Sequence, residues 1–155
     1  MQTGTIQINV NGEELPVYRA QPEGESQLPV VLVISEVAGV HEQVASLARR
    51  LARQGYLALA PDLFSRPNPS DAQVFADLDA VVAWAKTNGG DGDKISITGF
   101  CWGGRITWLY AAHNPDIKTG VAWYGGLAGK TSANFPRHPG HVAGPVSRFK
   151  QPELV

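Results

Sequence analysis

The residues best suited to covalent chemistry lie at positions 99–104, where the sequence reads Gly-Phe-Cys-Trp-Gly-Gly. The apolar run at 95–98 predicts a strand, and the pattern from Trp102 onward predicts a helix. Cys101, the only cysteine in the chain, therefore falls on a tight strand–helix turn, the position of the nucleophile in a nucleophile elbow. The sequence predicts that Cys101 is a catalytic nucleophile, with cysteine in place of the more usual serine.

Three physical features of this turn suit a nucleophile. Gly99 and Gly103 remove side chains that would clash where the strand and the helix cross, which leaves the sulfur exposed. The partial positive charge at the start of the helix favours the thiolate, and the N–H of Trp102 can hold a developing oxyanion. Two other interpretations stay open. A free cysteine is commonly a small buried hydrophobe, and glycines can cradle phosphate, although neither common phosphate motif is present.

Alternating strand and helix patterns are expected to position the turn. Residues 5–10 and 14–19 flank an Asn11-Gly12 turn and predict an antiparallel hairpin, in which Pro16 favours an edge strand. The other predicted elements are strands at 29–34, 56–60, 94–98 and 119–124 and helices at 44–52, 74–85 and 102–112. This order predicts an α/β fold with a mainly parallel sheet, an N-terminal antiparallel hairpin and helices on both faces.

Composition limits the function classes. The chain has 155 residues, 43% of them hydrophobic and 17% charged, with a net charge of −1, which indicates a globular domain without a basic surface for nucleic acid. No apolar stretch is long enough for a membrane span or a signal peptide, and one cysteine cannot form an internal disulfide. We therefore expect a cytoplasmic enzyme or binding protein, with no nucleic-acid or membrane partner.

The chain is interpreted as one partial domain, 1–155. Its last segment, residues 127–155, is rich in proline and glycine and shows little periodicity, so its packing is left open. A segment of this length without elements is unusual in a compact domain, and indicates either a functional loop or a segment whose packing partner is missing.

Three motifs occur together in this chain: Gly-Phe-Cys-Trp-Gly-Gly-Arg at 99–105, Ser-Glu-Val-Ala-Gly at 35–39 and Ala-Pro-Asp-Leu-Phe at 60–64. With them the chain resembles the dienelactone hydrolase family, over about residues 29–126, and Val-Ala-Trp-Tyr-Gly-Gly at 121–126 fits the same family. The resemblance implies an α/β-hydrolase fold that cleaves an enol-lactone or a similar small ester through a cysteine nucleophile and a thioacyl intermediate, without a cofactor or metal.

The resemblance also assigns site residues. Cys101 would be the nucleophile, and Glu36 would contact the thiol in the resting enzyme and take its proton when substrate enters. The N–H groups of Val37 and Trp102 would form the oxyanion hole, and Arg66 would bind a substrate carboxylate. Arg66 lies in a polar loop, which fits an ordinary surface arginine about as well as a substrate-binding one.

A complete hydrolase triad also needs an acid and a histidine after the nucleophile. His113 ends the helix that begins at the elbow, about 18 Å from Cys101, where it suits the helix C-terminus. His138 and His141 lie in the proline-rich tail, and His41 precedes the nucleophile near a helix start. The family places its acid and histidine after two further strands, so the resemblance implies that this chain holds the nucleophile without its base.

Two function classes follow. The first is the N-terminal part of a dienelactone-hydrolase-like enzyme that cleaves small lactones or esters, with little or no turnover by this chain alone. The second is a non-catalytic protein on a hydrolase scaffold that binds a small acid or ester, or that self-associates through an exposed sheet edge. A thiol redox protein fits less well, because there is no second cysteine to resolve a disulfide.

Overall fold

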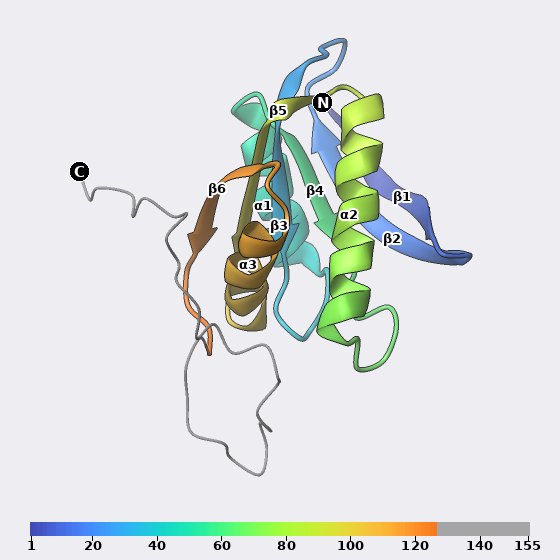
Figure 1. Cartoon of the computed structure of the whole chain (residues 1–155). Helices are drawn as coiled ribbons and strands as arrows, with labels where there is room; N and C mark the ends of the chain where they lie inside the picture. The colour runs from blue at the N-terminus through green and yellow to red at the C-terminus, as the bar shows by residue number, and fades with distance from the viewer. Residues whose placement is uncertain (127–155) are drawn as a thin grey trace, which may run out of the picture.

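The computed structural model describes residues 1–126, which form a six-stranded sheet with helices packed on both faces (Figure 1). The strand order is β1-β2-β4-β3-β5-β6. The pairs β1–β2 and β2–β4 are antiparallel, and the remaining neighbours are parallel. The expected α/β sheet is confirmed. In chain order, the elements are β1 (Gln2–Val10), β2 (Glu13–Gln21), β3 (Leu28–Ile34), α1 (Glu42–Arg53), β4 (Leu57–Pro61), α2 (Asp71–Thr87), β5 (Gly90–Gly99), α3 (Trp102–His113) and β6 (Ile117–Ala122).

The hairpin forms as expected, but its second strand is not an edge. Asn11 and Gly12 have φ values of 52° and 91°, as a two-residue turn with both central residues left-handed requires. The expectation from Pro16 was wrong, because β2 lies between β1 and β4. The β2–β4 pairing begins only at Val17, and the Pro16 carbonyl accepts a hydrogen bond from the N–H of Asp62. The missing N–H of Pro16 therefore falls beyond the end of that ladder, where no strand pair needs it.

The core has two layers because successive side chains of β3 point to opposite faces. Leu32 and Ile34 enter the larger cluster beneath α2 and α3, whereas Val31 and Val33 pack on the α1 side. In this arrangement α1 covers one face of the sheet and α2 and α3 cover the other (Figure 1). Both faces of β3 are thus buried, which explains its unbroken apolar sequence.

Local sequence sets the helices. Ser70 caps α2: its side chain accepts the N–H of Gln73, whose side chain in turn accepts the N–H of Ser70. α1 places small residues against the sheet, with Ala48 and Ala52 packed on Ala58. None of the helices in the described residues is long and apolar enough to cross a membrane.

Candidate active site

The strand–helix turn at Cys101 has the backbone of a nucleophile elbow. β5 ends at Gly99, α3 begins at Trp102, and Cys101 between them has φ 56° and ψ −120°. A non-glycine residue at this φ is uncommon, and a strained residue on such a turn holds its side chain out from the sheet. The side chain of Cys101 is partly buried, and its thiol is free. The structure therefore does not support the interpretation of Cys101 as an ordinary core residue.

Four glycines let three backbone segments meet at this turn. A Cβ on Gly103 would lie 2.5 Å from the carbonyl oxygen of Ile34, at the end of β3. A Cβ on Gly99 would meet the backbone of Gly103, and one on Gly104 would meet the carbonyl of Tyr124. A Cβ on Gly125 would lie 2.5 Å from the carbonyl oxygen of Cys101. Gly99 and Gly103 are explained by the local strand–helix crossing, whereas Gly104 and Gly125 are required by tertiary packing, which brings the segment after β6 to the elbow.

The two expected oxyanion donors lie on the segments that this packing brings together. The N–H of Gly103 donates to the Phe100 carbonyl at 2.8 Å, but the N–H of Trp102 makes no hydrogen bond within residues 1–126. The N–H of Val37 is likewise unpaired within this range, and its side chain is 63% exposed. Gly103 lies against the backbone of Ile34 and Ser35 at the end of β3, and Val37 follows two residues after Ser35. Their use as an oxyanion hole stays a prediction.

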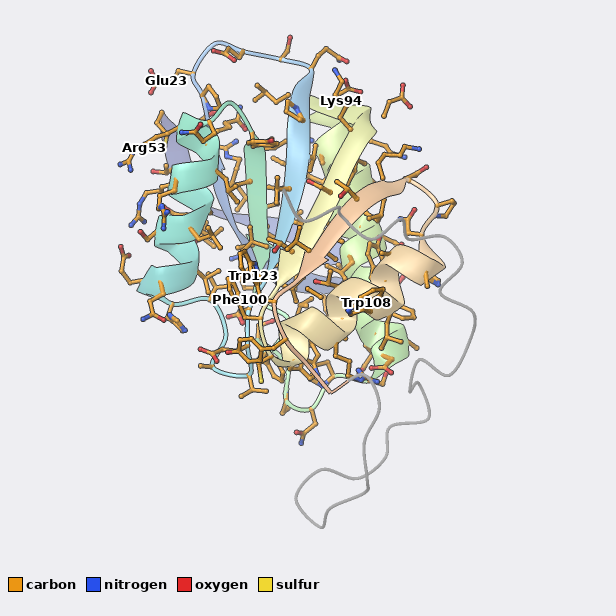
Figure 2. All side chains as sticks on the ribbon, turned by 90° about the vertical axis from the view of Figure 1, so that its left-hand side faces the viewer. Glu23, Arg53, Lys94, Phe100, Trp108 and Trp123 are labelled. Atoms are coloured by element: carbon orange, nitrogen blue, oxygen red, sulfur yellow. The ribbon has the colours of Figure 1, made fainter. Side chains whose placement is uncertain are left out.

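Aromatic side chains flank the elbow on both sides. The ring of Phe100 stacks on Trp123, with centroids 5.7 Å apart and planes 8° from parallel. Figure 2 shows these two residues together at the carboxyl end of the sheet. On the other side, Trp102 contacts Phe64, with centroids 4.6 Å apart. The loop after β4 and the segment after β6 thus form apolar walls around the turn.

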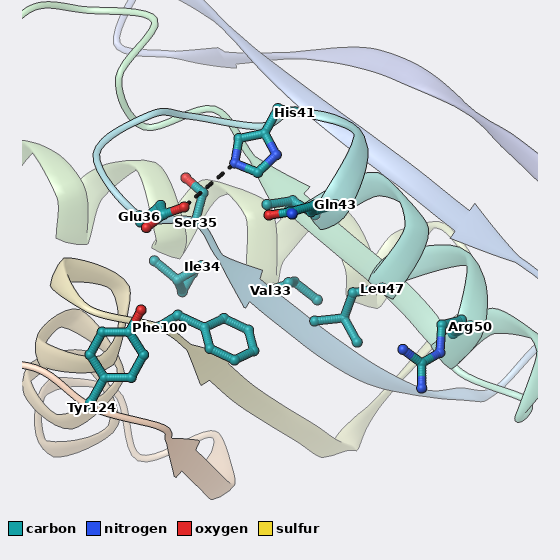
Figure 3. Close-up of a pocket in the computed structure, with 11 residues that line it drawn as sticks. Val33, Ile34, Ser35, Glu36, His41, Gln43, Leu47, Arg50, Phe100 and Tyr124 are labelled. Atoms are coloured by element: carbon teal, nitrogen blue, oxygen red, sulfur yellow. Dashed lines mark ion pairs between the residues drawn. The ribbon is translucent and has the colours of Figure 1, made fainter.

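Glu36 lies in a cavity beside the elbow and pairs with His41. The cavity, about 310 Å³, is lined by both residues together with Phe100, Tyr124 and Arg50 (Figure 3). The Nε2 of His41 lies 3.6 Å from Oε1 of Glu36. No hydrogen bond joins Glu36 to the thiol of Cys101 among the described residues, and the resting contact implied by the resemblance stays a prediction. The ion-pair partner of Glu36 is His41, which precedes the nucleophile in the chain.

Arg66 is held by protein carboxylates. Its guanidinium pairs with Asp77 on α2, whose side chain is 1% exposed, and with Oε2 of Glu13 at 2.5 Å. Burial raises the pKa of Asp77, while the hydrogen bond from Arg66 lowers it. One oxygen of Asp77 is buried without a hydrogen-bond partner in the described region. Substrate binding by Arg66 stays a prediction, and a substrate carboxylate would have to compete with these two partners.

The other basic residues near α3 have structural contacts. Arg105 is buried and donates to both oxygens of Asp71, at 2.9 and 2.8 Å. His113 ends α3, stacks on Phe75 and lies 3.5 Å from a carboxylate oxygen of Asp79. His138 and His141, with the whole segment 127–155, lie outside the described residues. Within residues 1–126, no group of His, Cys, Asp and Glu side chains is arranged to hold a metal ion.

The sequence model of the Dienelactone hydrolase family matches residues 15–74 and 67–146, which is most of the chain. The chain belongs to the dienelactone hydrolase family. A relative from Salmonella typhi, named "Putative carboxymethylenebutenolidase", is 49% identical over 162 residues, which cover 92% of this chain and 60% of the relative. A relative of the same name from Escherichia coli (strain K12) is 48% identical over 159 residues, which cover 90% of this chain and 59% of the relative.

A solved structure supports the same assignment. The protein in the crystal structure named "Putative Dienelactone Hydrolase" from Klebsiella pneumoniae is 48% identical in sequence. The two structures superpose with a TM-score of 0.81 over 89% of this chain and 65% of the Klebsiella chain. The chain spans about three fifths of the length of the relatives that it matches. The likeness in sequence and structure gives the described residues the α/β-hydrolase fold of this family.

Proposed function

We propose that this chain carries the nucleophile and the oxyanion donors of a hydrolase that cleaves small enol-lactones or esters. The observation that carries the proposal is the conformation of Cys101, φ 56° and ψ −120°, between a parallel strand and a helix start. Family membership supports the reaction class. Because the chain spans part of its relatives' length, this activity is proposed for the protein that contains the chain.

The chemistry proceeds by acyl transfer. Glu36 takes the proton of the Cys101 thiol, and the sulfur attacks the carbonyl carbon of the ester. The carbonyl oxygen gains a negative charge, which the N–H groups of Val37 and Trp102 stabilise. The C–O bond then breaks, the leaving oxygen takes up the proton held by Glu36, and the acyl group stays on sulfur as a thioester. Water cleaves the thioester, which returns a proton to the sulfur and releases the acid.

Deacylation needs a base to activate water, normally a histidine oriented by a carboxylate. The family resemblance places these residues on loops after two further strands. The acylation half of the reaction is therefore the part that residues 1–126 are equipped to perform, and it can be tested on this chain.

The test is acylation of the chain by an activated aryl acetate. We expect the release of up to one aryl alcohol per chain, together with a mass increase of one acetyl group on the peptide that contains Cys101. Cys101→Ala should show neither change, and Glu36→Gln should acylate more slowly, because general-base assistance contributes about 10²–10⁴-fold. Aryl alcohol released equally fast by Cys101→Ala would refute the proposal.

A second candidate function is self-association through β6. Among the described strands, β6 pairs only with β5, so its other edge is not paired within residues 1–126. Exposed apolar side chains lie on or just after it: Val121 is 44%, Trp123 62% and Tyr124 59% exposed. An unpaired strand edge beside apolar surface can pair with a second copy. Sedimentation over a range of concentrations should then show dimers that Val121→Lys weakens, whereas a monomer at every concentration would contradict it.

A further inference from the structure

The Glu36–His41 contact is built into the backbone at the end of β3. The N–H of Gly39 donates to the Glu36 carbonyl at 3.0 Å, which closes a four-residue turn. Gly39 has φ +78°, and a Cβ there would lie 3.1 Å from a carboxylate oxygen of Asp62, so a larger residue would be strained. The chain then bends at Val40, and the side chain of His41 lies beside that of Glu36.

His41 is also fixed by the helix that it starts. It is the N-cap of α1, with φ −109° and ψ −175°, and its carbonyl accepts the N–H of Ala45 at 3.0 Å. Its side chain makes no capping hydrogen bond to the helix. The imidazole therefore does not serve the helix start, and its Nε2 faces Glu36 instead (Figure 3).

The charges around His41 come from several elements. Glu36 and Arg50 line one cavity together with His41, and His41 also lines a second cavity with Tyr18, Glu42 and Asp62. Two of these groups have another partner, because Arg49 donates to the carboxylate of Glu42 and to the hydroxyl of Tyr18. Of the carboxylates in this set, Glu36 is the one that forms an ion pair with His41.

We propose that His41 is a positioning residue that competes with the Cys101 thiol for the carboxylate of Glu36. The inference rests on the proposed function, in which Glu36 acts on the thiol. When His41 carries a proton, it attracts the carboxylate and holds it away from the sulfur. When His41 is neutral or absent, the carboxylate is free to approach the sulfur, where its negative charge disfavours the thiolate and repels anionic reagents.

The experiment measures alkylation of Cys101 by iodoacetate, which is anionic, and by iodoacetamide, which is neutral. The single cysteine of the chain makes both rates specific to this site. We expect His41→Asn to lower the iodoacetate-to-iodoacetamide rate ratio by about two- to fivefold, the range for a pair of partly exposed charges.

Two further variants separate the positioning role from a structural one. In a Glu36→Gln background, His41→Asn should leave the ratio unchanged, because there is no carboxylate left to release. His113→Asn makes the same replacement at the far end of α3 and should keep the native ratio. Circular dichroism and urea unfolding of each variant report whether the fold is intact.

The outcomes distinguish this inference from the proposed function. If Glu36→Gln alters Cys101 alkylation while His41→Asn does not, the inference is wrong and the role of Glu36 stands. If Glu36→Gln changes neither rate, Glu36 does not act on the thiol, and both proposals for this residue fail. If His41→Asn lowers the ratio equally with and without Glu36, His41 acts on the site by another route and the inference is also overturned.

Discussion

Replacing Gly103 by alanine sets two known effects against each other. Gly103 lies in the first turn of α3, and Gly→Ala within a helix ordinarily stabilises a protein by about 0.5–1 kcal/mol. The new Cβ, however, would lie 2.5 Å from the carbonyl oxygen of Ile34 and 2.6 Å from that of Ser35. The sign of the measured change therefore shows whether helix propensity or the contact between α3 and β3 dominates.

The packing effect is expected to dominate. Cβ atoms essentially never approach closer than 3.0 Å, so α3 and the end of β3 must separate by about 0.5 Å or more. Both contacted atoms belong to the backbone of a buried strand end and cannot rotate away. Overpacking costs about 1–3 kcal/mol, and a contact between two backbone segments belongs in the upper part of that range, about 2–3 kcal/mol. Subtracting the helix gain of about 0.5–1 kcal/mol leaves a net loss of about 1–2.5 kcal/mol in the free energy of unfolding. This loss corresponds to a Tm about 2–10 °C lower.

Urea unfolding followed by tryptophan fluorescence measures this loss as a lower midpoint at an unchanged slope. Gly126→Ala is the matched control, because its Cβ would meet no atom of residues 1–126 within 4 Å, and its stability should stay within about 0.5 kcal/mol of the native chain. Gly103→Ala should also alter the rate of Cys101 alkylation, since the elbow moves with the start of α3. A Gly103→Ala chain as stable as the native one would refute the described contact between α3 and β3.

Two further predictions concern the buried charges. Burial raises the pKa of Asp77, so this carboxyl contributes stability that is fully present below the ordinary aspartate pKa and lost as the pH rises through its raised value. Urea unfolding at a series of pH values should show Asp77→Asn losing less stability than the native chain between acid and neutral pH, and parallel curves would contradict this. Arg105→Lys should lower the free energy of unfolding by about 1–3 kcal/mol, because lysine cannot donate to both oxygens of Asp71 from one planar group. Unchanged stability would show that the two hydrogen bonds from Arg105 to Asp71 contribute little.

The fold could be predicted because its signals are local. The Asn11-Gly12 turn requires left-handed backbone at two adjacent residues, and the structure has it there. The apolar run at the third strand requires burial on both faces, which the two helix layers provide. The prediction from Pro16 that its strand lies at a sheet edge was wrong, because the sequence does not show where a ladder of hydrogen bonds ends.

In the candidate site, the local features could be predicted from the sequence and the tertiary contacts could not. Cys101 and its flanking glycines are adjacent in the chain, so their spacing alone located the elbow. The partners of Arg66 come from α2 and from the start of β2, and only the packed sheet brings them to it. A loop arginine therefore carries no sequence signal that it faces a buried carboxylate.

The sequence by itself determined the position of a candidate nucleophile, because the strand, the glycines and the helix start around Cys101 are adjacent in the chain. The tertiary structure decided what surrounds that nucleophile. Gly104 and Gly125 bring the segment after β6 against the elbow, and the turn closed by Gly39 carries His41 back to Glu36. The physical reason is that side-chain chemistry and local backbone preference act over a few residues, whereas the distance between charges depends on how the whole sheet packs.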